Sequence, residues 1–216
     1  MHILRRANRP APTRLMLGSG VAVLLSLVLA SAASAETLQF KLRGQEAVAG
    51  FTSTDATGCV ITHVFIAAMD ANVKQGPGSA GSDSRSMASV SQYDRCASTE
   101  LLVAFGETIL PPEAFMITPL ESARLQATLV VFDRVSRDPL SLSVDLTWTA
   151  TGETARMKDH YQFKSPLVTV NARFTAVSRD AAARGTVSDG TTNLTPEPAQ
   201  FALLNSVKGG TLEISH

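Results

Sequence analysis

The sequence is poor in the residues that most often carry chemistry. Its 216 residues include four histidines, two cysteines, two tyrosines and one tryptophan, and only 18% of residues are charged. The two cysteines, at positions 59 and 96, are too far apart to form the C-x-x-C pair that zinc sites and thiol oxidoreductases use. The formal net charge is zero, so the sequence lacks the cationic excess that is typical of nucleic-acid-binding proteins.

Known catalytic motifs are missing as well. The sequence contains no G-x-S-x-G elbow, S-x-x-K, H-E-x-x-H or Walker loop. The remaining catalytic hypothesis is a carboxylate-dependent hydrolase that uses Asp133, Asp145 or Asp159. We therefore lean towards a protein that is not an enzyme, and we predict no catalytic residue, no metal ligand and no cofactor.

One long apolar run is present, and it lies near the N-terminus. Four arginines among the first 14 residues precede an apolar stretch over residues 15–30, and Ala33 and Ala35 then form an A-x-A pattern. This order is typical of a secretory signal peptide, and an apolar run of about 16 residues is shorter than a membrane-spanning helix requires. We predict cleavage after Ala35, with residues 1–35 as the signal peptide and residues 36–216 as a secreted or periplasmic chain that has no membrane span.

Removal of the signal peptide changes the charge. Residues 1–35 contain four of the 19 basic residues and none of the 19 acidic ones, which leaves the mature chain with a formal net charge of −4. A negative net charge disfavours binding to polyanions. We therefore expect neither nucleic acid nor an anionic membrane as a partner, and consider an unidentified protein, glycan or cell-surface component instead.

The two cysteines flank a predicted hairpin. Residues 60–68 are rich in β-branched and apolar side chains, residues 76–82 are turn formers, and residues 87–93 alternate again. Folding the hairpin about Pro77-Gly78 pairs residues whose numbers sum to 155, and this register sets Cys59 opposite Cys96. Because a secreted chain meets an oxidising compartment, we predict a disulfide between them. Residues 71–86 are expected to form a long polar loop.

The rest of the mature chain also alternates with a period of two. The clearest strand is Leu142–Trp148, and similar patterns cover residues 38–43, 124–131, 154–163 and 168–176. Turn-forming segments separate them, and no segment has the periodicity of a long helix. We predict a single all-β domain over residues 36–216 with about ten to twelve strands, an antiparallel two-sheet β-sandwich, with a closed antiparallel β-barrel as the alternative.

Three polar or aromatic residues invite a functional interpretation, and each has a simpler one. His63 shares its strand parity with Ile61 and Phe65, so we expect a core or edge histidine and not a metal ligand. His160 lies on a polar strand face and is expected to be exposed. Trp148 shares the apolar face of its strand, so we predict that it packs in the core and does not stack on a carbohydrate.

Two runs of the sequence carry a resemblance. The segments Asp145–Gly152 and Gly185–Asn193 resemble runs in small secreted bacterial β-rich proteins of unassigned function, over a region from about Cys59 to Lys208. The resemblance implies a bacterial origin and carries no activity or site residue with it.

Three functions follow as hypotheses. The first is a non-enzymatic binding or interaction module that uses the 71–86 loop for surface recognition. The second is a carrier of a lipid or another small ligand, which requires an apolar cavity. The third is the carboxylate-dependent hydrolase.

Overall fold

The computed structural model consists of long antiparallel strands, and it describes residues 38–75, 80–164 and 169–215. The described residues all belong to one compact unit, Ala35–His216. The strands in chain order are β1 (Leu38–Thr54), β2 (Val60–Gln75), β3 (Ala80–Asp94), β4 (Thr99–Ile109), β5 (Phe115–Thr118), β6 (Ser122–Asp133), β7 (Pro139–Lys164), β8 (Thr169–Ser188) and β9 (Phe201–Ser215). The all-β prediction is confirmed, but the described strands are fewer and longer than expected. The predicted signal peptide and its cleavage site after Ala35 lie outside the described residues.

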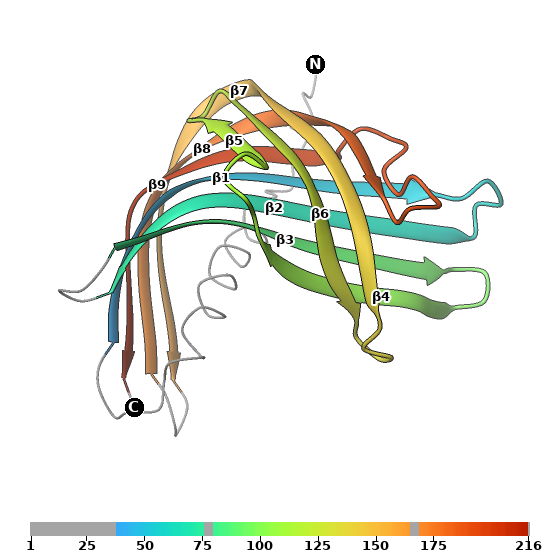
Figure 1. Ribbon diagram of the computed structural model, residues 1–216, viewed down its shortest axis with the longest axis horizontal. Helices are drawn as coiled ribbons and strands as arrows, with labels where there is room; N and C mark the ends of the chain where they lie inside the picture. Colours follow the sequence, from blue (N-terminus) through green and yellow to red (C-terminus); the bar gives the residue numbers. More distant parts are fainter. Residues whose placement is uncertain (1–37, 76–79, 165–168, 216) are drawn as a thin grey trace, which may run out of the picture. The chain divides into compact units, whose positions relative to one another are not determined.

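All nine strands belong to one large antiparallel sheet. Its order is β4-β3-β2-β1-β9-β8-β7-β6-β5, and β4 also pairs with β6 at Ala104–Asp133 and Phe105–Phe132 (Figure 1). No helix among the described residues is long and apolar enough to cross a membrane.

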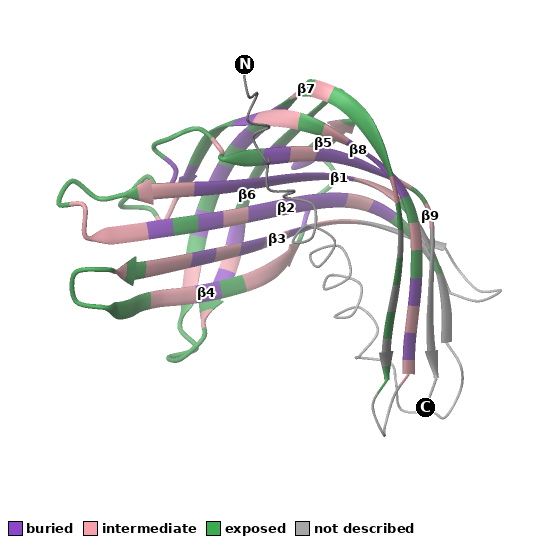
Figure 2. Ribbon diagram, turned by 180° about the vertical axis from the view of Figure 1, so that it is seen from behind, coloured by how far each residue is buried: buried purple, intermediate pink, exposed green. Residues whose placement is uncertain are grey.

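One face of the sheet lines the main hydrophobic core. The alternation of β7 is as predicted, since Leu142, Val144, Leu146 and Trp148 are buried while the residues between them are exposed. These side chains pack against the inward residues of β1, β2, β6 and β9, and Figure 2 shows the buried segments recurring along these strands. Trp148 is 1% exposed, which confirms its predicted place in the core.

The hairpin of β2 and β3 is present, but its predicted register is wrong by one residue. Val64 lies opposite Val90 and Thr62 lies opposite Gln92, so paired residue numbers sum to 154. A slip of one residue would turn every side chain of one strand to the other face. In the observed register both valines are buried in the core, whereas the predicted register would set Val64 opposite Ser91.

The prediction of a long polar loop over residues 71–86 is wrong as well. Most of this segment is strand, because β2 and β3 remain paired as far as Lys74–Ala80. The predicted turn at Pro77-Gly78 lies outside the described residues. The serines and glycines of this segment suggested a loop, but backbone pairing across two neighbouring strands keeps it extended.

The sheet bends beyond its core. Register shifts interrupt the pairing of three neighbouring strand pairs, between Leu42 and Gly44 of β1, between Thr175 and Ala176 of β8, and between Ala150 and Thr154 of β7. An extra residue on one strand of a pair bends that strand. Figure 1 shows β1, β7, β8 and β9 turning together, so that their far parts form an extension of the sheet.

Candidate functional site

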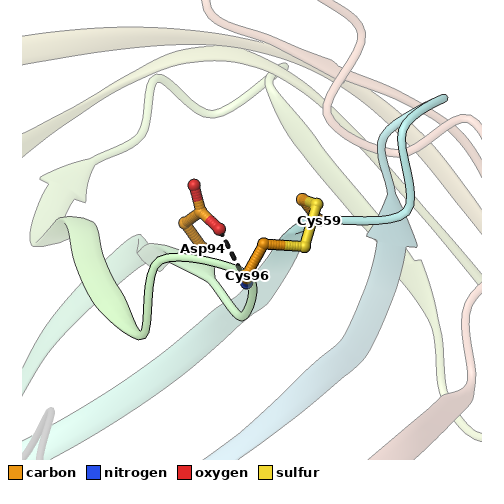
Figure 3. Close-up of side chains that lie close together, drawn as sticks. All are labelled: Cys59, Asp94 and Cys96. Carbon is orange, nitrogen blue, oxygen red and sulfur yellow. Dashed lines mark hydrogen bonds between the residues drawn. A yellow bond between two sulfur atoms is a disulfide. The ribbon is translucent and has the colours of Figure 1, made fainter.

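The disulfide lies at the end of the strands opposite to this extension. Cys59 and Cys96 are joined by an S–S bond of 2.01 Å, with their Cα atoms 5.3 Å apart. Cys59 directly precedes β2, and Cys96 follows β3. Asp94 Oδ1 accepts hydrogen bonds from the backbone N–H groups of Cys96 and Ala97, at 2.8 and 2.9 Å (Figure 3). Asp94 and the two sulfurs lie close together, but disulfide sulfurs are not the thiolates that bind metals. The predicted bridge is thus present, and it indicates a non-cytoplasmic protein.

A pocket of about 300 Å³ opens near the same end. Its apolar walls come from four separate parts of the chain, with Val90 from β3, Leu102 from β4, Leu140 from β7 and Leu194 from the segment after β8. The polar side chains that line it are Gln92, Asp133, Ser136, Asp138 and Asp189. Small-ligand sites combine apolar walls with a few polar groups in this way.

Two of the pocket carboxylates are held by tight turns. Asp133 Oδ1 accepts hydrogen bonds from the backbone N–H groups of Ser136 and Val135, at 2.7 and 2.8 Å. These hydrogen bonds, that of Ser136 first, favour the ionised carboxylate and lower the pKa of Asp133. We infer that Asp133 is negatively charged over the whole neutral range.

Asp189 is held in the same manner on the other side of the pocket. Its Oδ1 accepts hydrogen bonds from the backbone N–H groups of Thr192 and Thr191, at 2.8 and 2.9 Å. Burial raises its pKa, but these hydrogen bonds outweigh that effect and leave the pKa of Asp189 lowered. Asp138, the third carboxylate, is exposed on the turn between β6 and β7. The pocket therefore has apolar walls and a negatively charged rim.

His63 and His160 lie far apart and do not form a common site. His63 is exposed, and its Nδ1 lies 2.8 Å from Thr52 Oγ1, so its expected place in the core or at an edge is wrong. The prediction assumed that His63 shares a buried strand face with Ile61 and Phe65, but these two residues are only half-buried and lie on the outward face. His160 is exposed, as predicted, on β7. Three strands, β1, β9 and β8, separate the strands that carry the two histidines.

The three candidate carboxylates of a hydrolase are also far apart. Asp145 is opposite Gln126 on β6, seven residues before Asp133 at the end of that strand. Seven residues of strand correspond to about 23 Å, whereas glycoside hydrolysis needs carboxyl groups within about 10 Å. Asp159 lies in the extension, opposite Phe174, and its side chain lies outside what the structure describes. The carboxyl of Asp145 instead lies 3.6 Å from Arg124.

A row of buried polar residues that the sequence did not predict lies near the bend of the sheet. Glu46 is 8% exposed, and its Oε2 accepts a 2.8 Å hydrogen bond from Asn205 Nδ2. Ser178 Oγ in turn donates to Asn205 Oδ1 at 2.7 Å. Burial raises the pKa of Glu46, and the hydrogen bond from Asn205 offsets part of that effect. A lone glutamate among alanines and valines was the available signal, since ionisable residues are rarely buried without a partner.

Comparisons with known proteins add no relative. The chain matches no protein-family model, no curated protein and no solved structure.

Proposed function

We propose that this protein is a secreted or periplasmic, non-enzymatic binding protein that holds a small ligand in the pocket between β3, β4, β7 and the segment after β8. The observation that carries the proposal is the composition of the pocket, whose walls are apolar while its rim bears Asp133, Asp138 and Asp189. This arrangement fits a ligand with an apolar body and a positively charged or hydrogen-bond-donating group. It modifies the carrier hypothesis by placing the ligand at the end of the sheet.

The core supports this position of the ligand. The face of the sheet that would line an interior cavity is covered by large side chains with almost no exposure, including Trp148, Leu125 and Leu129. A ligand inside the core would have to displace them, at a cost of several kcal/mol. The pocket needs no such displacement.

Residues 1–35 are proposed to be a signal peptide that is removed after Ala35, and the Cys59–Cys96 disulfide supports export to an oxidising compartment. The intact mass of the exported protein tests this proposal. A mass that includes residues 15–30 would contradict it.

For the architecture we propose a closed barrel in preference to a two-sheet sandwich. The pairing of β4 with β6 supports closure, because it joins strands from the two halves of the sheet order. Hydrogen exchange of the Phe105 and Phe132 amides tests it. Closure predicts protection similar to that of the central strands, and rapid exchange at both would contradict it.

Titration calorimetry of the mature chain with three six-carbon probes tests the function. We expect hexylammonium to bind more tightly than 1-hexanol, and hexanoate to bind most weakly, because the carboxylates of the rim attract a cation and repel an anion. Asp138→Asn should weaken the binding of hexylammonium several-fold and leave hexanol unchanged. The matched control Glu113→Gln removes an exposed carboxylate outside the pocket lining and should change neither.

A second variant tests the walls. Leu140 is half-buried, so Leu140→Trp fills the pocket without opening the core, and it should abolish the binding of both probes. Circular dichroism establishes that the variant is folded. Absence of hexylammonium binding to the unmodified protein at millimolar concentration, or equal binding of the three probes, would overturn the proposal.

A further inference from the structure

The extension of the sheet gathers positive charge on one of its faces. Residues directly opposite each other in antiparallel strands share a face. One such row crosses five strands and consists of Lys74, Lys41, Thr211, Arg173 and His160. Including the neighbouring rows, the exposed cations of this surface, here called the basic face, are Lys41, Arg43, Lys74, Lys158, Lys164 and Arg173. These are six of the 15 basic residues that follow position 35.

The arrangement is unfavourable for the protein alone. Lys41 and Lys74 are direct cross-strand partners, and like charges in this position destabilise a sheet. Three arginines outside the basic face, Arg85, Arg124 and Arg134, each lie next to a carboxylate, as in the 2.7 Å ion pair between Arg134 and Glu100. The acidic positions in the register of the basic face are Glu213 and, in the next row towards the core, Asp70, which shares that row with the exposed Arg156. These two acidic positions are fewer than the six cations of the basic face. An external anion would relieve this repulsion.

We propose that the basic face binds a linear acidic polysaccharide. Its cations lie on β2, β1, β8 and β7, and β9 contributes Thr211 to the row between Lys41 and Arg173. Neighbouring strands are about 4.8 Å apart, so the cations are spread along a line across the extension and do not form a single anion site. A sheet twists from strand to strand, and a flexible polymer can follow a twisted line of charges, whereas a flat bilayer meets only part of it.

The residues between the cations favour a polysaccharide over a nucleic acid. Asn72, Gln162 and Thr175 are exposed on the same face and offer amide and hydroxyl groups for hydrogen bonds with sugar hydroxyls. Binding of single-stranded nucleic acid relies instead on aromatic side chains that stack on the bases. The net charge of −4 conceals this surface, because the compensating acids lie elsewhere in the chain.

The proposal is independent of the pocket, which lies towards the other end of the strands. Deleting the cations of the basic face should therefore leave hexylammonium binding unchanged, and Asp138→Asn should leave polymer binding unchanged. Failure of either proposal is thus separable from failure of the other.

Heparin is the probe for the experiment, with affinity measured on the mature chain at several salt concentrations. We expect the double variant Lys41→Gln/Lys74→Gln to bind heparin about tenfold more weakly, with the slope of log K against log salt reduced by about 2. The control Arg95→Gln/Arg184→Gln makes the same change in net charge at two exposed arginines outside the basic face, and should retain the affinity. Thermal melting should show that both double variants are folded, with Lys41→Gln/Lys74→Gln at least as stable as the original protein.

Equal loss of affinity in the two double variants would mean that heparin responds only to net charge, and would overturn the proposal. Two further arms test the class of polymer. Tighter binding to phosphatidylglycerol vesicles or to single-stranded DNA than to heparin, with dependence on the same two lysines, would overturn the assignment to a polysaccharide.

Discussion

Gly106 of β4 passes so close to Val130 of β6 that a Cβ atom on the glycine would overlap the Val130 carbonyl oxygen and lie 2.8 Å from the Cα atom of Val131. Glycine is therefore required where the two strands meet. Gly106→Ala should push β4 away from β6 and lower the free energy of unfolding by about 1–3 kcal/mol, as overpacking does. Urea denaturation measures this change.

The matched control for this substitution is Gly209→Ala. A Cβ atom at position 209 would meet no atom within 4 Å, and its backbone is not in the left-handed region. This control should change the unfolding midpoint little. Equal destabilisation by the two substitutions would contradict the close approach of β4 and β6.

Trp148 links two sides of the core, because its Nε1 donates a 2.9 Å hydrogen bond to the carbonyl oxygen of Val48. Trp148→Phe removes the donor and part of the ring, and should lower the free energy of unfolding by about 1–3 kcal/mol. Circular dichroism in urea provides the measurement, with the exposed Phe132→Leu as the control. A loss below 0.5 kcal/mol, on the scale of about ±0.5 typical of surface substitutions, would refute its buried role.

The disulfide closes a loop with a sequence separation of 37. On the chain-entropy model, Cys59→Ser/Cys96→Ser should lower the free energy of unfolding by about 3–4 kcal/mol, chiefly by enlarging the unfolded ensemble. Denaturation of the unmodified protein with and without a reductant should reproduce the same difference. Identical curves under the two conditions would indicate that the bridge is not formed in solution.

Because Glu46 is buried, we expect the free energy of unfolding to depend on pH. Since its pKa is raised in the folded state, its contribution is fully present below the ordinary value of 4.5 and is lost as the pH rises through the raised pKa. Glu46→Gln should therefore raise the melting temperature at pH 7 and have little effect at pH 4. The exposed Glu113→Gln serves as the control, and an equal effect of Glu46→Gln at both pH values would contradict the raised pKa of Glu46.

Alternation identified the fold class because half-buried strands such as Leu142–Trp148 record their two faces directly in the sequence. It failed where both faces are covered, as at Ala47, Val48 and Ala49, which are all buried. There the pattern carries no information on which side faces the core. The register of β2 and β3 was predicted wrongly for a related reason. It assumed a symmetric hairpin about Pro77-Gly78 and did not consider that Val64 and Val90, which are both buried, lie opposite each other.

The pocket was beyond the reach of sequence analysis. Leu102 and Leu194 are 92 positions apart, and only the folded sheet brings them together. Its carboxylates follow ordinary turn chemistry, in which an aspartate accepts hydrogen bonds from the next few amides. Asp133 was therefore a candidate only as a hydrolase carboxylate, and nothing in the sequence indicated that it shares a pocket with Asp189. The bend was equally hidden, because bulges depend on the pairing of neighbouring strands.

The basic face lies at one end of the strands, and the turns that carry Asp133, Asp138 and Asp189 lie at the other end, so that the two groups of charges form an electric dipole. A charged surface or polymer would exert a torque on it before contact, turning Lys41 and Arg173 towards negative charge and Asp133 and Asp189 away from it. Orientation on approach would then leave the pocket open to the surrounding solution while the other end is engaged.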